Sequence, residues 1–503
     1  MAAVHPVVGS SPAKFNYRWF PSFRMLTATL LCLCFASVQM MNSNMGMAIV
    51  CMVNSSEYVD LNSSVLPTDG VSISEAKEES LADMLTNKSI SKRNKALRLD
   101  WNADEQGYIF GAFNLGLLSM LGTGLVADKF NAKYMIIASV LIASMANLII
   151  ATASSISVYF AISGRLLVGI SDALLQPSVN SLITRWFSPA ERSYALGLAT
   201  GGRQLGTLVI VPASGALCSQ TVLFGGWPAI FYLSASVGIL FVVIYMFLGA
   251  DKPSKQTCIS DAELKFITAS NSCEDIGKKR IEREIPWMQI LKSAPVWSAV
   301  VAVICHEFPL MTMIMFLPSY LHDVHHYTAT ENGILSALPT ACLWISKIFS
   351  SYLNTFLQRR TKLHRTTICK LLNTIASCGL AFFLFTSTTL DASHASLAVV
   401  FLCASMASAG LHTPGCQTAL VSLAPAFSGA ITGLAFFFVA SAGIVNPVLT
   451  KWIVRWWAKS SRIYPEFVVA SVCPKSAMDQ TIHKSNNAQK LSSSKPAQHT
   501  ASV

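Results

Sequence analysis

Long apolar runs separated by short polar segments dominate this sequence. In the first half these runs cover residues 25–53, 104–126, 134–153, 158–183, 194–217 and 227–248. In the second half they cover residues 294–321, 331–357, 366–386, 393–420 and 428–452. Each run is close to the ~20 residues that a helix needs to cross a bilayer. The pattern therefore predicts an all-α polytopic membrane protein with about eleven spans, each a helix rather than a strand.

The polar segments divide the chain into five parts. We expect a cytoplasmic tail at 1–24, a first transmembrane half at 25–250, a cytoplasmic linker at 251–287, a second transmembrane half at 288–457 and a disordered tail at 458–503. The linker is dense in Lys, Arg, Asp and Glu, which is typical of a solvated connection between two membrane halves.

The C-terminal tail departs from this regular pattern. After residue 457 only the stretch 464–473 is apolar, and it is too short to span a bilayer, so we expect no twelfth span there. With an odd number of spans the tail would emerge outside, although its many Lys residues are typical of a cytoplasmic flank. We therefore expect an altered end.

Composition supports a membrane protein. The chain is 52% hydrophobic and only 13% charged, which is about half the charged fraction of a soluble domain. A net charge of +11 would indicate a nucleic-acid partner in a soluble protein, but here it places basic loops such as 358–365 on the cytoplasmic side. No nucleophile–base pair, metal-ligand cluster or nucleotide-binding loop is evident. We therefore expect no enzyme, no metal, no cofactor and no nucleic-acid partner.

The spacing of the cysteines does not indicate a chemical role. There are 13, and most lie within apolar runs, as do Cys51, Cys305 and Cys403. Their spacing fits neither a zinc site nor a disulfide framework. We therefore predict that they act as small apolar packing residues.

Two polar segments predict topology and contacts. The loop after the first run holds three N-x-Ser sequons, at Asn54, Asn62 and Asn87. Such sequons are glycosylated only on the non-cytoplasmic side, so we expect this loop to be luminal or extracellular and to carry glycans.

In the turn 124–133, Asp128 precedes two lysines. We expect Asp128 to cap a helix end and to latch neighbouring helices together.

The fourth apolar run carries a stripe of polar side chains. On a helix, Arg165, Gly169, Asp172, Gln176 and Asn180 fall on one face. The two charged residues either neutralise each other between packed helices or line a solute or proton pathway. We favour the pathway because charged side chains at membrane depth are costly and usually functional.

Several short motifs complete the pattern. They are NMGMAIVCMVN at 44–54, GAFNLG at 111–116, ERS at 191–193, QLGT at 204–207, IPW at 285–287 and LPSY at 317–320. With two halves joined by a charged linker, the chain resembles the major facilitator superfamily. Within it, the chain is similar to the anion-transporter family that contains sialin, the vesicular glutamate transporters and the sodium–phosphate cotransporters. The resemblance covers roughly residues 25–452.

The resemblance implies transport of an organic anion or phosphate by alternating access, with the solute held between the two halves. The family's working residues match in part. Its fourth-span arginine is Arg165, and its fourth-span glutamate, linked to proton coupling, falls on Asp172. Positions that carry arginine or histidine in relatives fall on Asn42, Asn180 and His306.

Cations are needed to hold a carboxylate or a phosphate in a dry site. Arg165 supplies one, and Arg203, where relatives carry a small neutral residue, supplies another. His306 lies beside Glu307 and is either structural or a pH-sensitive group. Lys347 either contributes charge or extends its side chain to the cytoplasmic interface.

These residues predict a mechanism. Arg165 holds the anion, and Asp172, about 10 Å away along the helix axis, takes the coupled proton. Without solute, ionised Asp172 is expected near Arg165. The substrate-binding candidates are thus Arg165, Asn42, Arg203, Asn180 and His306.

We conclude from the sequence that the chain is a secondary active transporter of a small anion. A proton or a sodium ion is the expected coupling ion, and the expected location is the plasma membrane or a lysosomal or vesicular membrane. The alternative is a transport-inactive membrane protein that acts as a sensor or partner, or a partial gene product. It is motivated by the missing twelfth span and by Asn42 and Asn180 at positions where relatives carry charge.

Overall fold

The computed structural model describes residues 22–52, 99–101, 103–219, 226–256, 258–271, 285–323, 329–390 and 394–460. The three predicted glycosylation sites Asn54, Asn62 and Asn87 lie outside these residues, as does the tail after residue 460.

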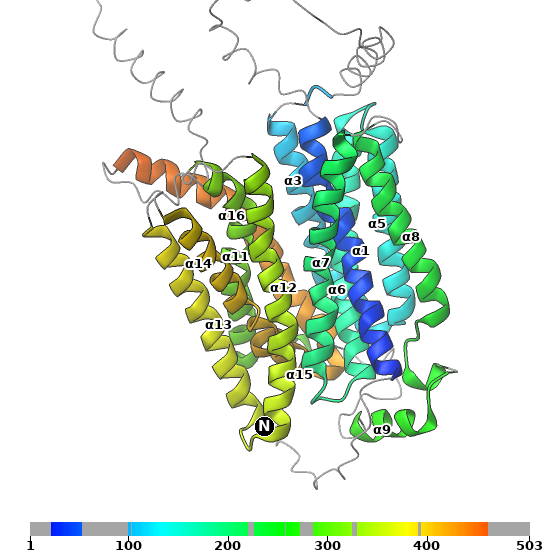
Figure 1. The fold of residues 1–503 in the computed structure, drawn as a ribbon. Helices are drawn as coiled ribbons and strands as arrows, with labels where there is room; N and C mark the ends of the chain where they lie inside the picture. Colours follow the sequence, from blue (N-terminus) through cyan, green and yellow to red (C-terminus); the bar gives the residue numbers. More distant parts are fainter. Residues whose placement is uncertain are drawn as a thin grey trace, which may run out of the picture.

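The helices form two bundles that stand side by side (Figure 1). The first bundle contains α1 (Phe23–Met52), α3 (Ala103–Leu117), α4 (Met120–Lys129), α5 (Ala132–Ala153), α6 (Val158–Trp186), α7 (Arg192–Ser219) and α8 (Trp227–Leu248). The second contains α11 (Ala294–Asp323), α12 (Ala329–Arg360), α13 (Arg365–Thr388), α14 (Ala395–Ala409), α15 (Thr418–Leu423) and α16 (Ser428–Ser460). Between them the chain forms the short helices α9 (Asp261–Asn271) and α10 (Trp287–Leu291). The predicted all-α class is confirmed.

Nine helical stretches of the described residues are long and apolar enough to cross a membrane. Two further helices, α7 with 28 residues and α12 with 32, have the length but are more polar, because they carry charged side chains between the bundles. The predicted total of about eleven spans therefore remains a prediction.

Two expected helices are interrupted. The second apolar run breaks at Leu118–Ser119 into α3 and α4. The tenth run turns into a π-helical segment at Thr413–Gln417, between α14 and α15. Pro414 has no backbone N–H to donate, and such π segments are frequent at functional positions of helices. The periodicity of apolar residues did not reveal either break, because both sides of each break remain apolar.

The two bundles are joined at one end, which we call the linker end because α9 lies there (Figure 1). Both carboxylate oxygens of Asp128, in the last turn of α4, accept hydrogen bonds from the first backbone N–H groups of α16. The distances are 3.0 Å from Gly429 and 2.8 Å from Ala430. A carboxylate at a helix N-terminus also interacts favourably with the helix dipole. The predicted latch is confirmed.

A buried charge network lies at the same end. Arg24, inside α1, forms ion pairs with Glu191 and with Glu263 of α9, and the Arg359 guanidinium of α12 donates to Glu191 at 3.2 Å. Glu191 is 1% exposed. It therefore joins the two bundles through one carboxylate.

This end is more buried than the sequence pattern indicates. Arg24 lies inside α1, where Glu263 and Glu191 bind it. The linker is not wholly solvated, since α9 supplies Glu263. Arg185 and Trp186, at the end of α6, are also buried: Asp251 pairs with Arg185, and the Ala250 carbonyl accepts from the Trp186 indole at 3.0 Å.

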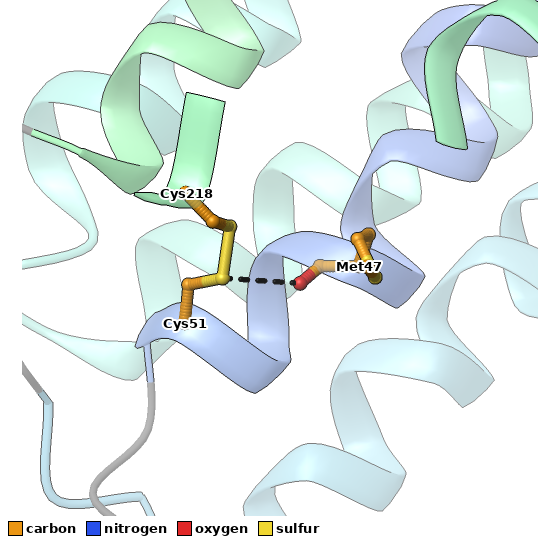
Figure 2. Close-up of a disulfide and its surroundings, with 3 residues drawn as sticks. All are labelled: Met47, Cys51 and Cys218. Carbon is orange, nitrogen blue, oxygen red and sulfur yellow. Dashed lines mark hydrogen bonds between the residues drawn. A yellow bond between two sulfur atoms is a disulfide. The ribbon is translucent and has the colours of Figure 1, made fainter. Parts of the chain in front are cut away.

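A disulfide links α1 to α7 at the opposite end, which we call the disulfide end. Cys51 in the last turn of α1 is bonded to Cys218 in the last turn of α7, 167 residues later. Figure 2 shows the bond and the Met47 carbonyl oxygen, 3.7 Å from the Cys51 sulfur. That approach is only a contact, because a disulfide sulfur carries no proton. The prediction that Cys51 is a packing residue is therefore wrong.

Candidate functional site

The polar stripe of α6 points into the protein, as the sequence predicts. The helix begins where the Ser157 hydroxyl accepts a hydrogen bond from the Tyr159 N–H, and it continues for 29 residues. Arg165, Asp172 and Asn180 are 4%, 5% and 2% exposed. Charged and amide groups buried to this degree need partners, and the partners come from α1, α7 and α16.

Asp172 is held by Arg203 of α7. Two guanidinium nitrogens of Arg203 donate to its two carboxylate oxygens, at 2.9 and 2.7 Å, and one of them also donates to Gln176 at 3.1 Å. A bidentate pair of this kind is strong because both hydrogen bonds are charge-assisted. The side chain of Arg203 is 24% exposed, against 7% for Asp172. The expectation that Arg165 balances Asp172 is therefore wrong.

Close packing of α7 against α1 fixes the direction of Arg203. A Cβ at Gly202 would lie 2.0 Å from the Cys32 carbonyl oxygen, and a Cβ at Gly206 would lie 2.4 Å from the Ala36 carbonyl oxygen. Two glycines four residues apart let two helix backbones approach closely. Arg203, next to the first of them, then extends over the ring of Phe35, 4.8 Å from the ring centre.

Arg165 interacts with α1 through neutral groups. It donates to the Asn42 carbonyl oxygen at 2.9 Å and to the Asn42 amide oxygen at 3.0 Å, and its guanidinium lies 5.1 Å from the centre of the Phe113 ring. Among the described residues, no carboxylate lies within ion-pair distance of Arg165, and its Nε has no hydrogen-bond partner. A buried cation without a counter-charge is costly, and a bound anion would offset that cost.

The α1 helix brings the two arginines to neighbouring positions. Gln39 approaches Arg203 at 3.5 Å, and Asn42, three residues further, binds Arg165. Residues three apart on a helix share one face. Gln39 also donates to Ser43 at 2.8 Å, and Ser43 lies 3.1 Å from the Thr207 hydroxyl of α7. The sequence pattern does not single out Gln39, Ser43 and Thr207 as partners, although they are polar residues within apolar runs.

Asn180 connects α6 to the second bundle. Its amide nitrogen donates to the Thr432 hydroxyl of α16 at 3.0 Å, and its oxygen lies 3.4 Å from the Gln176 amide nitrogen. Asn180 is thus a contact between the bundles, close to the latch that Asp128 makes with the same helix.

The second bundle supplies His306 and Lys347. His306 of α11 stacks on His412, with ring centroids 3.8 Å apart, and it is 6% exposed. Lys347 of α12 is 8% exposed, which argues against a side chain that extends to the interface. Arg203 and Lys347 lie within electrostatic range of each other, so the ionisable groups of the two bundles face each other.

These groups thus lie between two helical bundles, on α1, α6 and α7 on one side and on α11 and α12 on the other. A model of the Major Facilitator Superfamily matches residues 31–447, which is most of the chain. The chain belongs to the Major Facilitator Superfamily. It is therefore a multi-pass integral membrane protein of a family of transporters, not enzymes.

The resemblance of this Major Facilitator Superfamily protein to the anion transporters is also confirmed. Human sialin (Homo sapiens) is 29% identical over 357 residues, which cover 70% of each chain. A probable small intestine urate exporter of Mus musculus is 29% identical over 440 residues, covering 86% of this chain and 85% of that one. The sodium-dependent phosphate transport protein 3 of Mus musculus is 25% identical over 438 residues, covering 85% and 87%.

Two solved structures of the Major Facilitator Superfamily have a similar fold. The proton:xylose symporter XylE superposes with a TM-score of 0.59 at 13% identity, covering 90% of this chain and 93% of that one. The fucose:proton symporter FucP of E. coli gives a TM-score of 0.55 at 14% identity, covering 89% and 96%. At these identities the likeness shows the two-bundle architecture alone.

Proposed function

We propose that this protein is a secondary active transporter of a small organic or inorganic anion, working by alternating access. The observation that carries the proposal is the buried Arg165, which lacks a carboxylate counter-charge among the described residues and stands beside the Arg203–Asp172 pair. Relatives named for sialic acid, urate and phosphate support an anion as the solute. The solute binds between the two bundles, where these side chains meet.

Coupling follows from competition for Arg203. In the described conformation both terminal nitrogens of Arg203 donate to the carboxylate of Asp172. An incoming anion at Arg165 and Arg203 takes these positions, and Asp172 then binds one proton, because an ionised carboxylate without its cation is unfavourable there. One anion and one proton are thus bound together, and release of the proton restores the ion pair. Sodium coupling would not need Asp172 to change its protonation.

Replacing Asp172 by asparagine is expected to separate binding from coupling. Asparagine no longer competes as an anion for Arg203, so solute binding should persist and tighten several-fold. Proteoliposomes that contain the variant should exchange solute across the membrane, but should not accumulate it against a gradient when only a pH gradient is imposed. Asp261→Asn, an exposed carboxylate in α9, is the matched control. Uphill accumulation by Asp172→Asn would exclude Asp172 as the proton carrier.

Uptake by the purified protein tests the proposal itself. Radiolabelled phosphate, urate, sialate and acidic amino acids are offered to proteoliposomes, with and without a pH gradient or a sodium gradient. Uptake of at least one anion that is lost in Arg165→Gln supports the transporter. No uptake of any of these anions would favour the alternative, a transport-inactive membrane protein.

We also propose that the disulfide end faces the lumen or the extracellular space. Disulfides persist in oxidising compartments, and Cys51–Cys218 lies at the end of α1 that leads into the sequon-bearing loop. The basic segment 358–365 lies at the linker end, where Arg359 pairs with Glu191 in the network that includes Glu263 of α9.

Glycosidase treatment of the protein from eukaryotic cells should therefore increase its gel mobility. The increase should disappear stepwise when Asn54, Asn62 and Asn87 are each replaced by glutamine. If protease reached this loop only from the cytosol, the orientation would be reversed.

A further inference from the structure

A second group of ionisable side chains lies in the second bundle, apart from Arg203 and Asp172. It contains His306 and Glu307 on α11, Lys347 on α12 and His412, which directly precedes the π-helical segment. The rings of His306 and His412 are stacked nearly parallel, at 10° between their planes. The proposed transport mechanism uses none of these residues.

The hydrogen bonds of the two histidines are incomplete. His412 Nδ1 lies 3.0 Å from the Asn373 amide oxygen, so Nδ1 carries the proton that is donated there. Among the described residues, neither His412 Nε2 nor His306 Nδ1 has a hydrogen-bond partner. The two side chains are 1% and 6% exposed. Polar atoms buried this far are normally paired, so these two ring nitrogens are positioned for a group that the protein does not itself supply.

Lys347 makes this position electropositive. It lies within electrostatic range of both histidines, and no carboxylate of the described residues forms an ion pair with it. Its backbone lies where the bundles meet, because a Cβ added at Gly197 of α7 would come within 3.2 Å of the Lys347 carbonyl oxygen. A Cβ added at Gly410, two residues before His412, would lie 2.9 Å from the Lys347 backbone nitrogen, so Lys347 and His412 come from neighbouring chain segments. Lys347 is thus a buried cation in the same region as the two unpartnered ring nitrogens.

The charges around this group come from both bundles. Glu307 on α11 is the neighbouring acid, and it lies within electrostatic range of Lys347 and of Arg203 on α7. Without solute, Glu307 partly balances these two cations across the interface. An anion that reaches Lys347 therefore competes with Glu307, as an anion at Arg203 competes with Asp172.

We propose that Lys347, His306 and His412 form a second anion-binding subsite, in the second bundle. This rests on the proposed function: one anionic group of the solute binds at Arg165 and Arg203, and a second polar or anionic group binds at this subsite. Lys347 and the Nδ1–H of His306 donate to the second group, and Nε2 of His412 accepts from a hydroxyl or amine of the solute. The site therefore selects elongated anions with two separated polar groups over compact ones such as phosphate.

Thermal unfolding of the purified protein in nanodiscs tests the subsite. The midpoint is measured against concentration for inorganic phosphate, sialate and glutamate, in the wild type and in Lys347→Gln. Sialate or glutamate, which carry two separated polar groups, should lose at least tenfold in apparent affinity. Phosphate, which needs only the arginines, should change less than threefold. Lys370→Gln, an exposed lysine on α13, is the matched control and should bind all three as the wild type does.

Two further variants distinguish a loss of binding from a loss of folding. Lys347→Met removes the buried charge with a side chain of similar length and without a new polar group. His306→Gln keeps a donor at the subsite but removes the stacked ring. Both should weaken the elongated anions selectively.

The outcomes distinguish the subsite from the transporter. Elongated anions that depend on Arg203 but bind all three variants as tightly as the wild type would overturn the subsite and leave the proposed function standing. Anions that stabilise no form of the protein would overturn both.

Discussion

Arg203→Gln is expected to abolish transport and to lower stability at the same time. Glutamine cannot donate two charge-assisted hydrogen bonds to Asp172, whose side chain is only 7% exposed. Leaving one partner of a buried pair without its counter-charge costs roughly 3–5 kcal/mol, and the lower end applies because Arg203 is partly exposed. Transport should fall more than 100-fold in proteoliposomes, and the unfolding midpoint should fall by several degrees.

The double variant Arg203→Gln/Asp172→Asn separates the two effects. It removes both charges, so the midpoint should return most of the way to the wild-type value, whereas transport should stay lost. Arg203→Lys keeps the charge without the planar fork and should be intermediate. Arg365→Gln removes an exposed arginine of α13 and should do neither. Wild-type transport by Arg203→Gln would exclude Arg203 from the anion site.

Glu191→Gln should open the linker end. The Glu191 carboxylate binds Arg24 of the first bundle and Arg359 of the second, so neutralising it removes a charge-assisted contact between them. Arg24 keeps Glu263, and Asp128 still caps α16, so the protein should remain folded. Each ~1.4 kcal/mol lost from the closed form lowers its population relative to the open form about tenfold.

The substitution Thr432→Cys reports this opening. Thr432 is fully buried and lies on α16 at the contact with Asn180. In the Glu191→Gln background, a membrane-impermeant thiol reagent applied at the linker end should label this cysteine at least tenfold faster, as quantified by mass spectrometry of its peptide. Asp261→Asn, in α9 at the same end, should leave the rate unchanged. Equal labelling in all three backgrounds would show that Glu191 does not hold the bundles together.

The sequence predicted those features that depend on one helix or on one short turn. The α6 stripe followed from helical periodicity, and the Asp128 latch followed from an acid at a helix end. Arg203 was recognised as an extra cation, but its pairing with Asp172 was not predicted. That pairing depends on the rotation of α7 against α1 and α6, which the glycines at 202 and 206 fix through backbone contact.

Contacts between residues far apart in the chain could not be predicted from the sequence for the same reason. His412 lies in an apolar run and gave no periodic signal, yet the fold stacks it on His306 of another helix. Cys51 and Cys218 are 167 residues apart, and nothing in their spacing distinguishes them from the other cysteines. Such pairs depend on which faces of different helices pack against each other. The local pattern of a single sequence does not reveal this packing.

The Cys51–Cys218 bond lies wholly within the first bundle, and this limits the path that a solute can take. α1 carries Gln39 and Asn42, α7 carries Arg203, and the bond fastens these two helices at the disulfide end while the glycine contact fastens them near the middle. α1 and α7 are therefore held together at two points and cannot separate to let a solute pass between them. The route proposed for the solute then runs between the two bundles, where α7 faces α12 and where α3 and α4 of the first bundle face α16.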